Sequence, residues 1–195
     1  MRYFFLEYKY PRKGFIDGAV SFSPSLKVNY SAIKYNLPKF TISEITLLPS
    51  IRKMDVDFFY TTASVLLVSD DLMSALDGLN IGQFIPSVVK YSDGSIVNKK
   101  YWVTHNLRKI DCLDYNLSEY AGKRMVLDSI QNPPKRIVKG LKKIVLDVSK
   151  INGAEFFLLD NCQYMPNPII SEILYEKIKK HKLKINATPV GDFKV

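Results

Sequence analysis

The segment from Val65 to Leu76 constrains the fold most, because an apolar run passes directly into a helix start. Val65–Val68 is a continuous run of apolar, mostly branched residues, which is typical of a strand buried on both faces. Ser69 follows as a helix N-cap, and the pair Asp70-Asp71 falls in the first helical turn, where the helix dipole favours acidic side chains. Leucines then continue at helical spacing. The chain must therefore place a short amphipathic helix against a sheet.

The same order of signals occurs twice in the chain. Residues 57–89 run through an acidic residue, Phe-Phe, a turn, an apolar strand, a serine, a short amphipathic helix and an extended exit with a proline, and residues 155–190 repeat that order. Leu174 matches Leu72 at an offset of 102 residues. We expect an internal pseudo-repeat of strand, Ser-capped helix and strand, which arises either by duplication or by reuse of one strand–cap–helix pattern.

These signals predict an α+β fold, or alternatively an α/β fold, in which short amphipathic helices lie on a mixed β-sheet. A chain of 195 residues suits a single domain, 1–195, and 47% hydrophobic with 24% charged residues is typical of a globular protein. Residues 123–131 fit a strand or a helix equally well. The pattern in residues 15–50 is too weak to predict a structure there.

The expected compartment follows from the cysteines and the apolar runs. Cys112 and Cys162 stand 50 residues apart without a Cys-x-x-Cys pair, and we expect both to be buried and reduced. The first apolar run breaks at Glu7, which is too early for the core of a signal peptide. No apolar run reaches the roughly 18 residues that a membrane span needs. We therefore expect a cytoplasmic protein that does not bind a membrane.

The charge of +9 is distributed unevenly along the chain. Residues 1–97 hold 10 basic and 9 acidic residues, whereas residues 98–195 hold 18 basic and 10 acidic ones. Neither basic cluster contains the aromatic residues that stack on bases, so we rank nucleic acid below an acidic protein as a partner. A solvated surface without a partner stays the simplest alternative. The first cluster is where we expect partner contact, at Lys135, Arg136, Lys139, Lys142 and Lys143; the second comprises Lys177, Lys179, Lys180, Lys182 and Lys184.

Recognisable catalytic motifs are absent from the sequence. It has no glycine-rich phosphate loop, no His-Glu-x-x-His and no Gly-x-Ser-x-Gly. The least unfavourable catalytic set is His105, Asp111 and Cys112, although a nucleophilic cysteine needs a lowered pKa and a nearby base. We expect a protein that is not an enzyme and uses no cofactor or metal, and we keep an enzyme of unrecognised class as the alternative.

Several short motifs follow one another in a characteristic order along the chain. They are Val68–Leu72, Phe84–Pro86, Leu107–Asp111, Leu117–Tyr120, Ile144–Lys150, Phe156-Phe157 and Ile170–Glu172, with Arg2–Leu6 as a fitting first strand. Their order resembles one family of bacterial immunity proteins, the eleventh of those that accompany polymorphic toxins. The resemblance covers about residues 60–190 and departs from the family pattern at Ile185–Pro189, where a Gly-aromatic-x-Pro exit is expected.

This resemblance implies a protein that binds a cognate toxin and blocks its active domain. An inhibitor of this kind needs anchor residues surrounded by complementary charge. With the basic clusters, the resemblance implies a toxin that has an acidic surface or a carboxylate-lined cleft. The toxin's identity and the oligomeric state do not follow from the sequence.

Overall fold

The structure is a computed structural model, and it describes residues 1–8, 18–23, 42–61, 65–79, 81–105, 107–132, 136–163 and 167–193. Contacts gather the chain into two compact units. Unit 1 comprises Met1–Leu6, Arg108–Glu176 and Ala187–Val195, and unit 2 comprises Glu7–Leu107 and Lys177–Asn186. That residues 1–195 unfold as a single domain stays a prediction.

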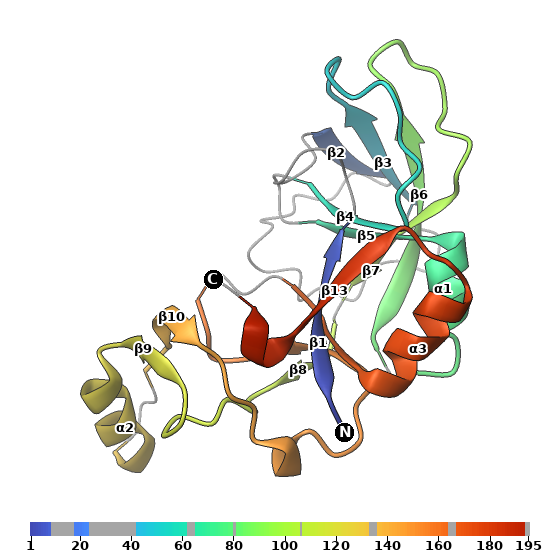
Figure 1. Ribbon diagram of the computed structural model, residues 1–195. Helices are drawn as coiled ribbons and strands as arrows, with labels where there is room; N and C mark the ends of the chain where they lie inside the picture. Colours follow the sequence, from blue (N-terminus) through green and yellow to red (C-terminus); the bar gives the residue numbers. More distant parts are fainter. Residues whose placement is uncertain are drawn as a thin grey trace. The chain divides into compact units, whose positions relative to one another are not determined.

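Strands outnumber helices in this fold (Figure 1). The described helices are α1 (Asp70–Leu76), α2 (Lys123–Gln131) and α3 (Glu172–Lys180), with two 3₁₀ turns at Val148–Lys150 and Val190–Asp192. The strands are β1 (Tyr3–Tyr8), β2 (Gly18–Ser23), β3 (Ile42–Leu47), β4 (Phe58–Tyr60), β5 (Leu66–Ser69), β6 (Gln83–Lys90), β7 (Tyr101–His105), β8 (Lys109–Ile110), β9 (Glu119–Ala121), β10 (Lys139–Lys143), β11 (Phe156–Leu159), β12 (Ile169–Ser171) and β13 (Ile185–Pro189).

Unit 2 is built on a six-stranded sheet in the order β2-β3-β6-β7-β5-β4. Its neighbours are antiparallel except β3 and β6, which run parallel. The predicted buried strand is β5, whose four residues are all buried, and α1 packs beside β5 and β7. One apolar cluster, which includes Ile45, Phe59, Leu67 and Val103, forms the core of this unit.

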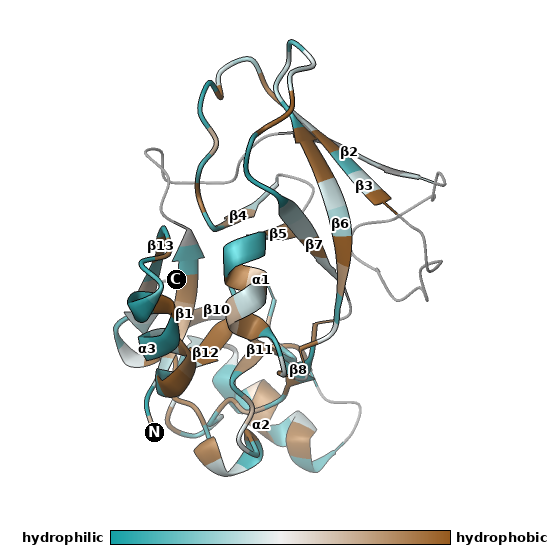
Figure 2. Cartoon of the chain, turned by 90° about the vertical axis from the view of Figure 1, so that its right-hand side faces the viewer, coloured by the Kyte–Doolittle hydropathy of each residue, from teal (hydrophilic) through white to brown (hydrophobic). Residues whose placement is uncertain are grey.

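The five-stranded sheet that carries much of unit 1 has the order β13-β1-β12-β11-β8, with antiparallel β1–β12 and β11–β12 pairs and a parallel β11–β8 pair. The apolar colouring of β11 and β12 in Figure 2 matches their burial. A separate two-stranded ribbon, β9–β10, lies beside α2. Tyr120, Val126, Val138 and Leu141 join the ribbon and α2 to the same apolar core as Phe157.

Two hairpin–helix segments share their pairing and their caps. In the first, β4 pairs with β5, the Ser69 N–H donates to the Asp57 carbonyl, and the Leu72 N–H donates to the Ser69 Oγ at 3.1 Å. In the second, β11 pairs with β12, and Ser171 bonds in the same way to the Glu155 carbonyl and to the Leu174 N–H at 3.2 Å. That the two segments are copies of one ancestral unit stays a prediction.

Mixed sheets with three helices make this an α+β fold. Residues 123–131, which fit either element, form a helix whose buried residues Val126 and Ser129 stand three apart on one face. We predicted one mixed sheet, whereas the described residues form two sheets and a ribbon, because β11 and β12 pair with β1 and β8.

Candidate functional site

The predicted contact residues lie on and just before β10. Only Leu141 is buried in this strand, so the side chains of Lys139, Lys142 and Lys143 remain exposed. Arg136 precedes the strand and is also exposed. Lys135 lies outside the described residues. The structure therefore gathers four of the five expected cations on one short stretch of unit 1.

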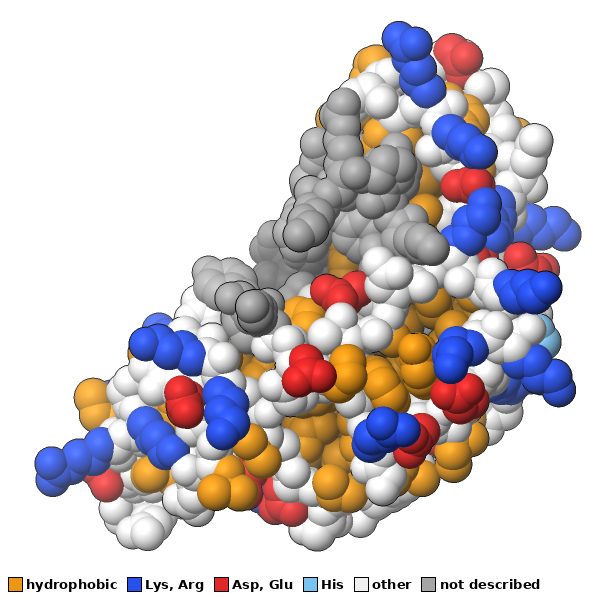
Figure 3. Space-filling view, viewed as in Figure 1, with side chains coloured by type: hydrophobic (Ala, Val, Ile, Leu, Met, Phe, Trp, Pro, Cys, Tyr) orange, Lys and Arg blue, Asp and Glu red, His pale blue; other side chains and the backbone are white. Residues whose placement is uncertain are grey.

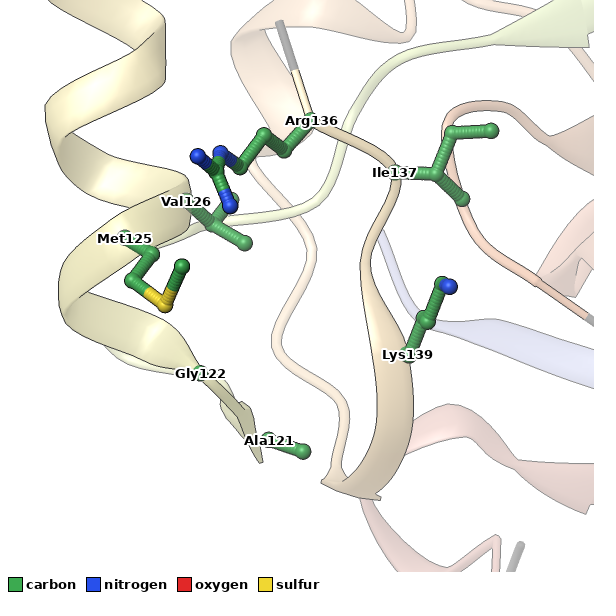
Figure 4. Close-up of a pocket in the computed structure, with 7 residues that line it drawn as sticks. All are labelled: Ala121, Gly122, Met125, Val126, Arg136, Ile137 and Lys139. Atoms are coloured by element: carbon green, nitrogen blue, oxygen red, sulfur yellow. The ribbon is translucent and has the colours of Figure 1, made fainter.

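An apolar groove lies between α2 and the segment 136–139, and we call it the α2 groove. Its volume is about 540 Å³. Figure 4 shows the Arg136 side chain pointing toward α2, above Met125, whereas Ile137 and Lys139 point away from the helix. Buried Val126 ties the groove to the core, while Met125 and Ile137 are 53% and 56% exposed. The lining residues are Ala121, Gly122, Met125, Val126, Arg136, Ile137 and Lys139.

Two glycines shape the walls of the α2 groove. Gly122 is the N-cap of α2 and has a φ of 65°, a left-handed conformation that glycine adopts without a steric cost. Gly140 has a φ of 54°, and a Cβ at this position would lie 3.2 Å from the Cβ of Ala121. Side chains larger than hydrogen at these positions would strain the helix start and the β9–β10 ribbon.

The backbone of Arg136 is held at both its N–H and its carbonyl. Its N–H donates to the Ser129 Oγ at 3.0 Å, and Ser129 is a buried residue of α2. Its carbonyl accepts from the Asn161 Nδ2 at 3.2 Å, and the same amide donates to the Tyr115 hydroxyl at 3.0 Å. Tyr115 in turn donates to Asp111. This chain of hydrogen bonds connects the Arg136 segment to the core of unit 1.

Burial raises the pKa of Tyr115, and its hydrogen bond to Asp111 adds to the shift. The phenol therefore stays protonated at neutral pH and keeps its place as a donor in the chain. Asp111, a member of the alternative catalytic set His105, Asp111 and Cys112, is half-buried and serves as the acceptor for that phenol. Its position is accounted for by this structural bond.

The cations of this stretch have no carboxylate partner among the residues that the structure describes: no ion pair there involves Arg136 or Lys139, which line the α2 groove, or Lys142 or Lys143, which follow on β10. Residues 119–143 contain seven basic side chains, Lys123, Arg124, Lys135, Arg136, Lys139, Lys142 and Lys143, against the two acidic ones of Glu119 and Asp128. Figure 3 shows hydrophobic side chains lying among Lys and Arg side chains over α2 and the ribbon. The surface thus combines apolar area with uncompensated positive charge.

A second cavity, which we call the polar cavity, lies in unit 2 and has a volume of about 330 Å³. Asp57 is almost fully buried in it, and its carboxylate accepts from the Ser69 Oγ at 2.6 Å and from the Lys184 N–H. Lys99 forms ion pairs with Asp57 and, at 3.6 Å, with Asp71. The lining residues are Asp57, Asp71, Ser74, Lys99, His181, Lys182, Leu183 and Lys184.

The second basic cluster is distributed differently. Lys184 lines the polar cavity and forms an ion pair with Asp55, which does not line it. Lys177, Lys179 and Lys180 lie in the last turn of α3, where the helix dipole favours cations. These interactions within the protein explain the positions of most lysines of the second cluster, so no partner protein is needed to explain them.

Cys112 does not have the features of a nucleophile. Its side chain is fully buried, and burial, helped by the charge of Asp111, raises the pKa of the thiol to about 12. A neutral buried thiol is a poor nucleophile. Cys112 and Cys162 are not joined in a disulfide, and Cys162 is half-buried, less than expected. The side chain of His105 lies outside the described residues.

The part of the chain that the structure describes contains no group of three or more His, Cys, Asp or Glu placed to hold a metal ion. None of its described helices is long and apolar enough to cross a membrane.

Sequence reasoning found the cations of the α2 groove but missed its apolar and supporting residues. Met125 and Ile137 lie on either side of Pro133-Pro134 in the sequence, and neither belongs to a recognisable motif. Ser129 and Asn161 support Arg136 through hydrogen bonds that join residues 7 and 25 positions from it. The sequence signals that could have indicated this support were Ser129, a polar residue within an amphipathic segment, and Asn161, and neither identifies its partner.

Comparison with known proteins gives one family. No curated protein matches the chain. The family model of the Immunity protein family (Imm11) matches residues 25–186, so the match begins well before residue 60, where the sequence analysis expected it. Because this match spans most of the 195 residues, the chain belongs to the Imm11 immunity protein family.

Proposed function

We propose that this protein neutralises a cognate bacterial toxin by binding to it and blocking its active domain. The observation that carries the proposal is its membership of an immunity protein family. A protein with this role acts by covering a surface, so it needs no catalytic group of its own. The α2 groove supports the proposal, because exposed apolar side chains beside unpaired cations are typical of a surface that meets a partner.

The proposed partner surface is acidic, either a charged face or a carboxylate-lined cleft. Arg136, Lys139, Lys142 and Lys143 lie exposed on one stretch of unit 1, and Lys135 precedes them in the sequence. Opposite charges on two proteins speed their encounter and select the partner. We therefore assign these cations to the steering of the toxin, and the apolar groove beside them to the contact itself.

A nucleic-acid partner is less well supported. Among the described residues, the large hydrophobic side chains that are exposed are methionines, isoleucines, leucines and a valine, and none is aromatic. Proteins that bind single strands stack bases on exposed aromatic rings. We also propose action in a reducing compartment such as the cytoplasm, which agrees with Cys112 and Cys162 being thiols and not a disulfide.

The test is rescue of growth by co-expression with the toxin encoded beside this chain's gene. Expression of the toxin alone is expected to stop growth, and co-expression with this protein to restore it. The purified pair should also elute as one complex. A harmless neighbour, or a toxic one that this protein neither rescues nor binds, contradicts the proposal.

A charge-reversed variant tests the steering role through the association rate of the purified protein and toxin. Replacing Arg136, Lys139, Lys142 and Lys143 together by Glu is expected to slow association about tenfold or more at low salt, because steering raises association rates by 10-fold to 1,000-fold. The matched control reverses four exposed lysines of the second cluster, Lys177, Lys179, Lys180 and Lys182. Equal effects in both variants would show that total charge, and not this surface, sets the rate.

A further inference from the structure

The α2 groove has the construction of an anchor site, and not only of a charged surface. Its wall on α2 is apolar: Met125 is more than half exposed, and the buried Val126 beside it belongs to the core of unit 1. Its opposite side carries Arg136, whose side chain points toward α2 (Figure 4). A cation and an apolar surface therefore face the same small space.

The polar cavity of unit 2 has no comparable capacity to take up a ligand. Its buried carboxylate, Asp57, is already bonded to Ser69, Lys99 and Lys184. An incoming group would have to compete with these bonds. The α2 groove needs no such exchange, because none of its described lining residues is acidic.

Arg136 is also held ready for binding. Ser129 holds its N–H and Asn161 holds its carbonyl, so its backbone does not have to be ordered when a partner arrives. Ordering a flexible segment costs affinity, and a segment that is already fixed avoids that cost. Arginine is among the residues that most often dominate the energy of protein interfaces. Ser129 and Asn161 are positioning residues for Arg136 in this account.

The chemistry of the groove identifies its occupant. Residues 119–143 carry seven basic and two acidic side chains, so a partner segment must bring negative charge. The exposed Met125 and the buried Val126 beside it offer apolar area to an apolar side chain, which a free inorganic anion lacks. A volume of about 540 Å³ holds a few side chains of a protein segment.

We propose that the α2 groove receives one segment of the toxin in which an apolar side chain stands beside a carboxylate. The apolar side chain packs against Met125 and Val126, and the carboxylate pairs with Arg136, whose guanidinium can donate two parallel hydrogen bonds. This inference rests on the proposed function and adds to it the element of the toxin that is recognised.

The experiment measures binding of the purified, catalytically inactivated toxin encoded beside this chain's gene to two groove variants. Met125→Glu places a carboxylate against the apolar wall, and Arg136→Glu reverses the charge that faces it. Each is expected to raise the Kd about 30-fold or more, which is the size of a hot-spot loss. Thermal unfolding of each variant, unchanged from wild type, shows that folding is intact.

Two matched controls change residues that do not line the groove. Ile173→Glu changes an apolar side chain on α3 that is 56% exposed, close to the 53% of Met125, and Arg52→Glu changes an exposed arginine of unit 2. Both are expected to change the Kd less than about threefold, because neither residue belongs to the proposed contact and a few residues carry most of the binding energy. In addition, one toxin Asp→Arg or Glu→Arg replacement should restore binding to Arg136→Glu and weaken binding to wild type.

The outcomes separate this inference from the proposed function. Wild-type protein that neither binds nor neutralises the toxin overturns both. A tight wild-type complex that Met125→Glu and Arg136→Glu leave unchanged overturns the groove alone. If wild type instead binds vesicles of anionic lipid and Met125→Glu abolishes that binding while the toxin complex persists, the groove is a membrane contact and the inference is wrong.

Discussion

Two cavities of this protein are lined by basic side chains, and they differ in what stands beside the cations. The α2 groove sets Arg136 and Lys139 among apolar side chains, and its described lining includes no acidic residue. The polar cavity sets Lys99 against Asp57 and Asp71, so the protein itself supplies the opposite charge. The comparison teaches that the number of basic residues does not locate a binding surface. The decisive property is whether their charge is already balanced.

The internal balance in the polar cavity follows from its place in the fold. Asp57 lies at the start of β4, where its backbone carbonyl accepts from the Ser69 N–H and its carboxylate accepts from the Ser69 Oγ. The N–H of Lys184 also donates to this carboxylate, which connects a distant segment of unit 2 to the first hairpin. A group with this many partners serves the structure of the unit.

The largest expected effect is on stability, in Asp57→Ala. Removal of the carboxylate leaves the ammonium of Lys99 without its buried partner and two donors, of Ser69 and Lys184, without an acceptor. Breaking a buried pair from one side costs about 3–5 kcal/mol. Urea unfolding of wild type and variant measures this difference, and Asp57→Asn, which keeps an acceptor oxygen, should lose less.

Glu155→Ala is the control for Asp57→Ala. Glu155 holds the corresponding place in the second hairpin, since its carbonyl accepts from the Ser171 N–H, but its side chain is only half-buried. Its loss should cost less than about 1 kcal/mol. If Asp57→Ala cost no more than that, the polar cavity would have charge to offer a partner and the contrast with the α2 groove would fail.

A second, smaller loss of stability is expected for Ser129, which supports the α2 groove, when it is compared with Ser74, which lines the polar cavity. The Ser129 Oγ donates to the Val126 carbonyl and accepts from the Arg136 N–H, whereas the Ser74 Oγ donates only to the Asp70 carbonyl on an exposed turn. Ser129→Ala is therefore expected to cost about 1–2 kcal/mol, because it leaves a partly buried N–H unpaired. Ser74→Ala should cost less than about 0.5 kcal/mol. Urea unfolding measures both losses.

Toxin binding distinguishes positioning from mere stability. Ser129→Ala should weaken binding several-fold under conditions where the protein is fully folded, and Ser74→Ala should leave it unchanged. Asn161→Gly offers a second variant, because glycine tolerates the φ of 57° at this position while losing the amide that holds Arg136. Unaltered binding in both Ser129→Ala and Asn161→Gly would contradict the inference that these residues hold Arg136 in place for binding.

The fold could be predicted where the signals stand next to one another in the sequence. The buried strand and its Ser69 cap are adjacent, and the structure confirms both. The helix over residues 123–131 could not be distinguished from a strand, because the burial of Val126 and Ser129 depends on packing against distant residues. Pairing of β11 with β8 joins segments about 50 residues apart, which no local pattern specifies.

The candidate site could be predicted only in its charge. Arg136 and Lys139 were found because basic residues are visible in any sequence. The groove they border forms only when α2 folds against the ribbon, so Met125 gave no signal by itself. Asp57 was noted as an acidic residue before Phe-Phe, and its burial became evident only with Lys99 and Lys184 beside it.

The smallest expected effect concerns Asp55, which forms ion pairs with Lys184 and, at 3.5 Å, with Lys53, just outside the polar cavity. Its side chain is 39% exposed, so solvent screens these pairs, and Asp55→Asn should lose only about 0.2–1 kcal/mol. The hydrogen bond from Lys184 and the charges of Lys184 and Lys53 hold the pKa of Asp55 below its usual 3.8. Urea unfolding, repeated at low and high salt, measures the difference.

The dependence of this difference on pH and salt makes it informative. Because the folded pKa is the lower one, the contribution of Asp55 is complete well above pH 3.8 and declines as the pH falls through the lowered value, so wild type and Asp55→Asn should converge in acid. Asp93→Asn is the control: the pKa of Asp93 is lowered by its bonds to Ser95, an uncharged partner, so its effect should resist salt. A salt-resistant loss in Asp55→Asn would mean that the charges around the polar cavity are more shielded from water than their exposure indicates. The ion pairs near the polar cavity would then neutralise its charge more strongly than exposed ion pairs do. That result would sharpen the contrast with the unpaired cations of the α2 groove.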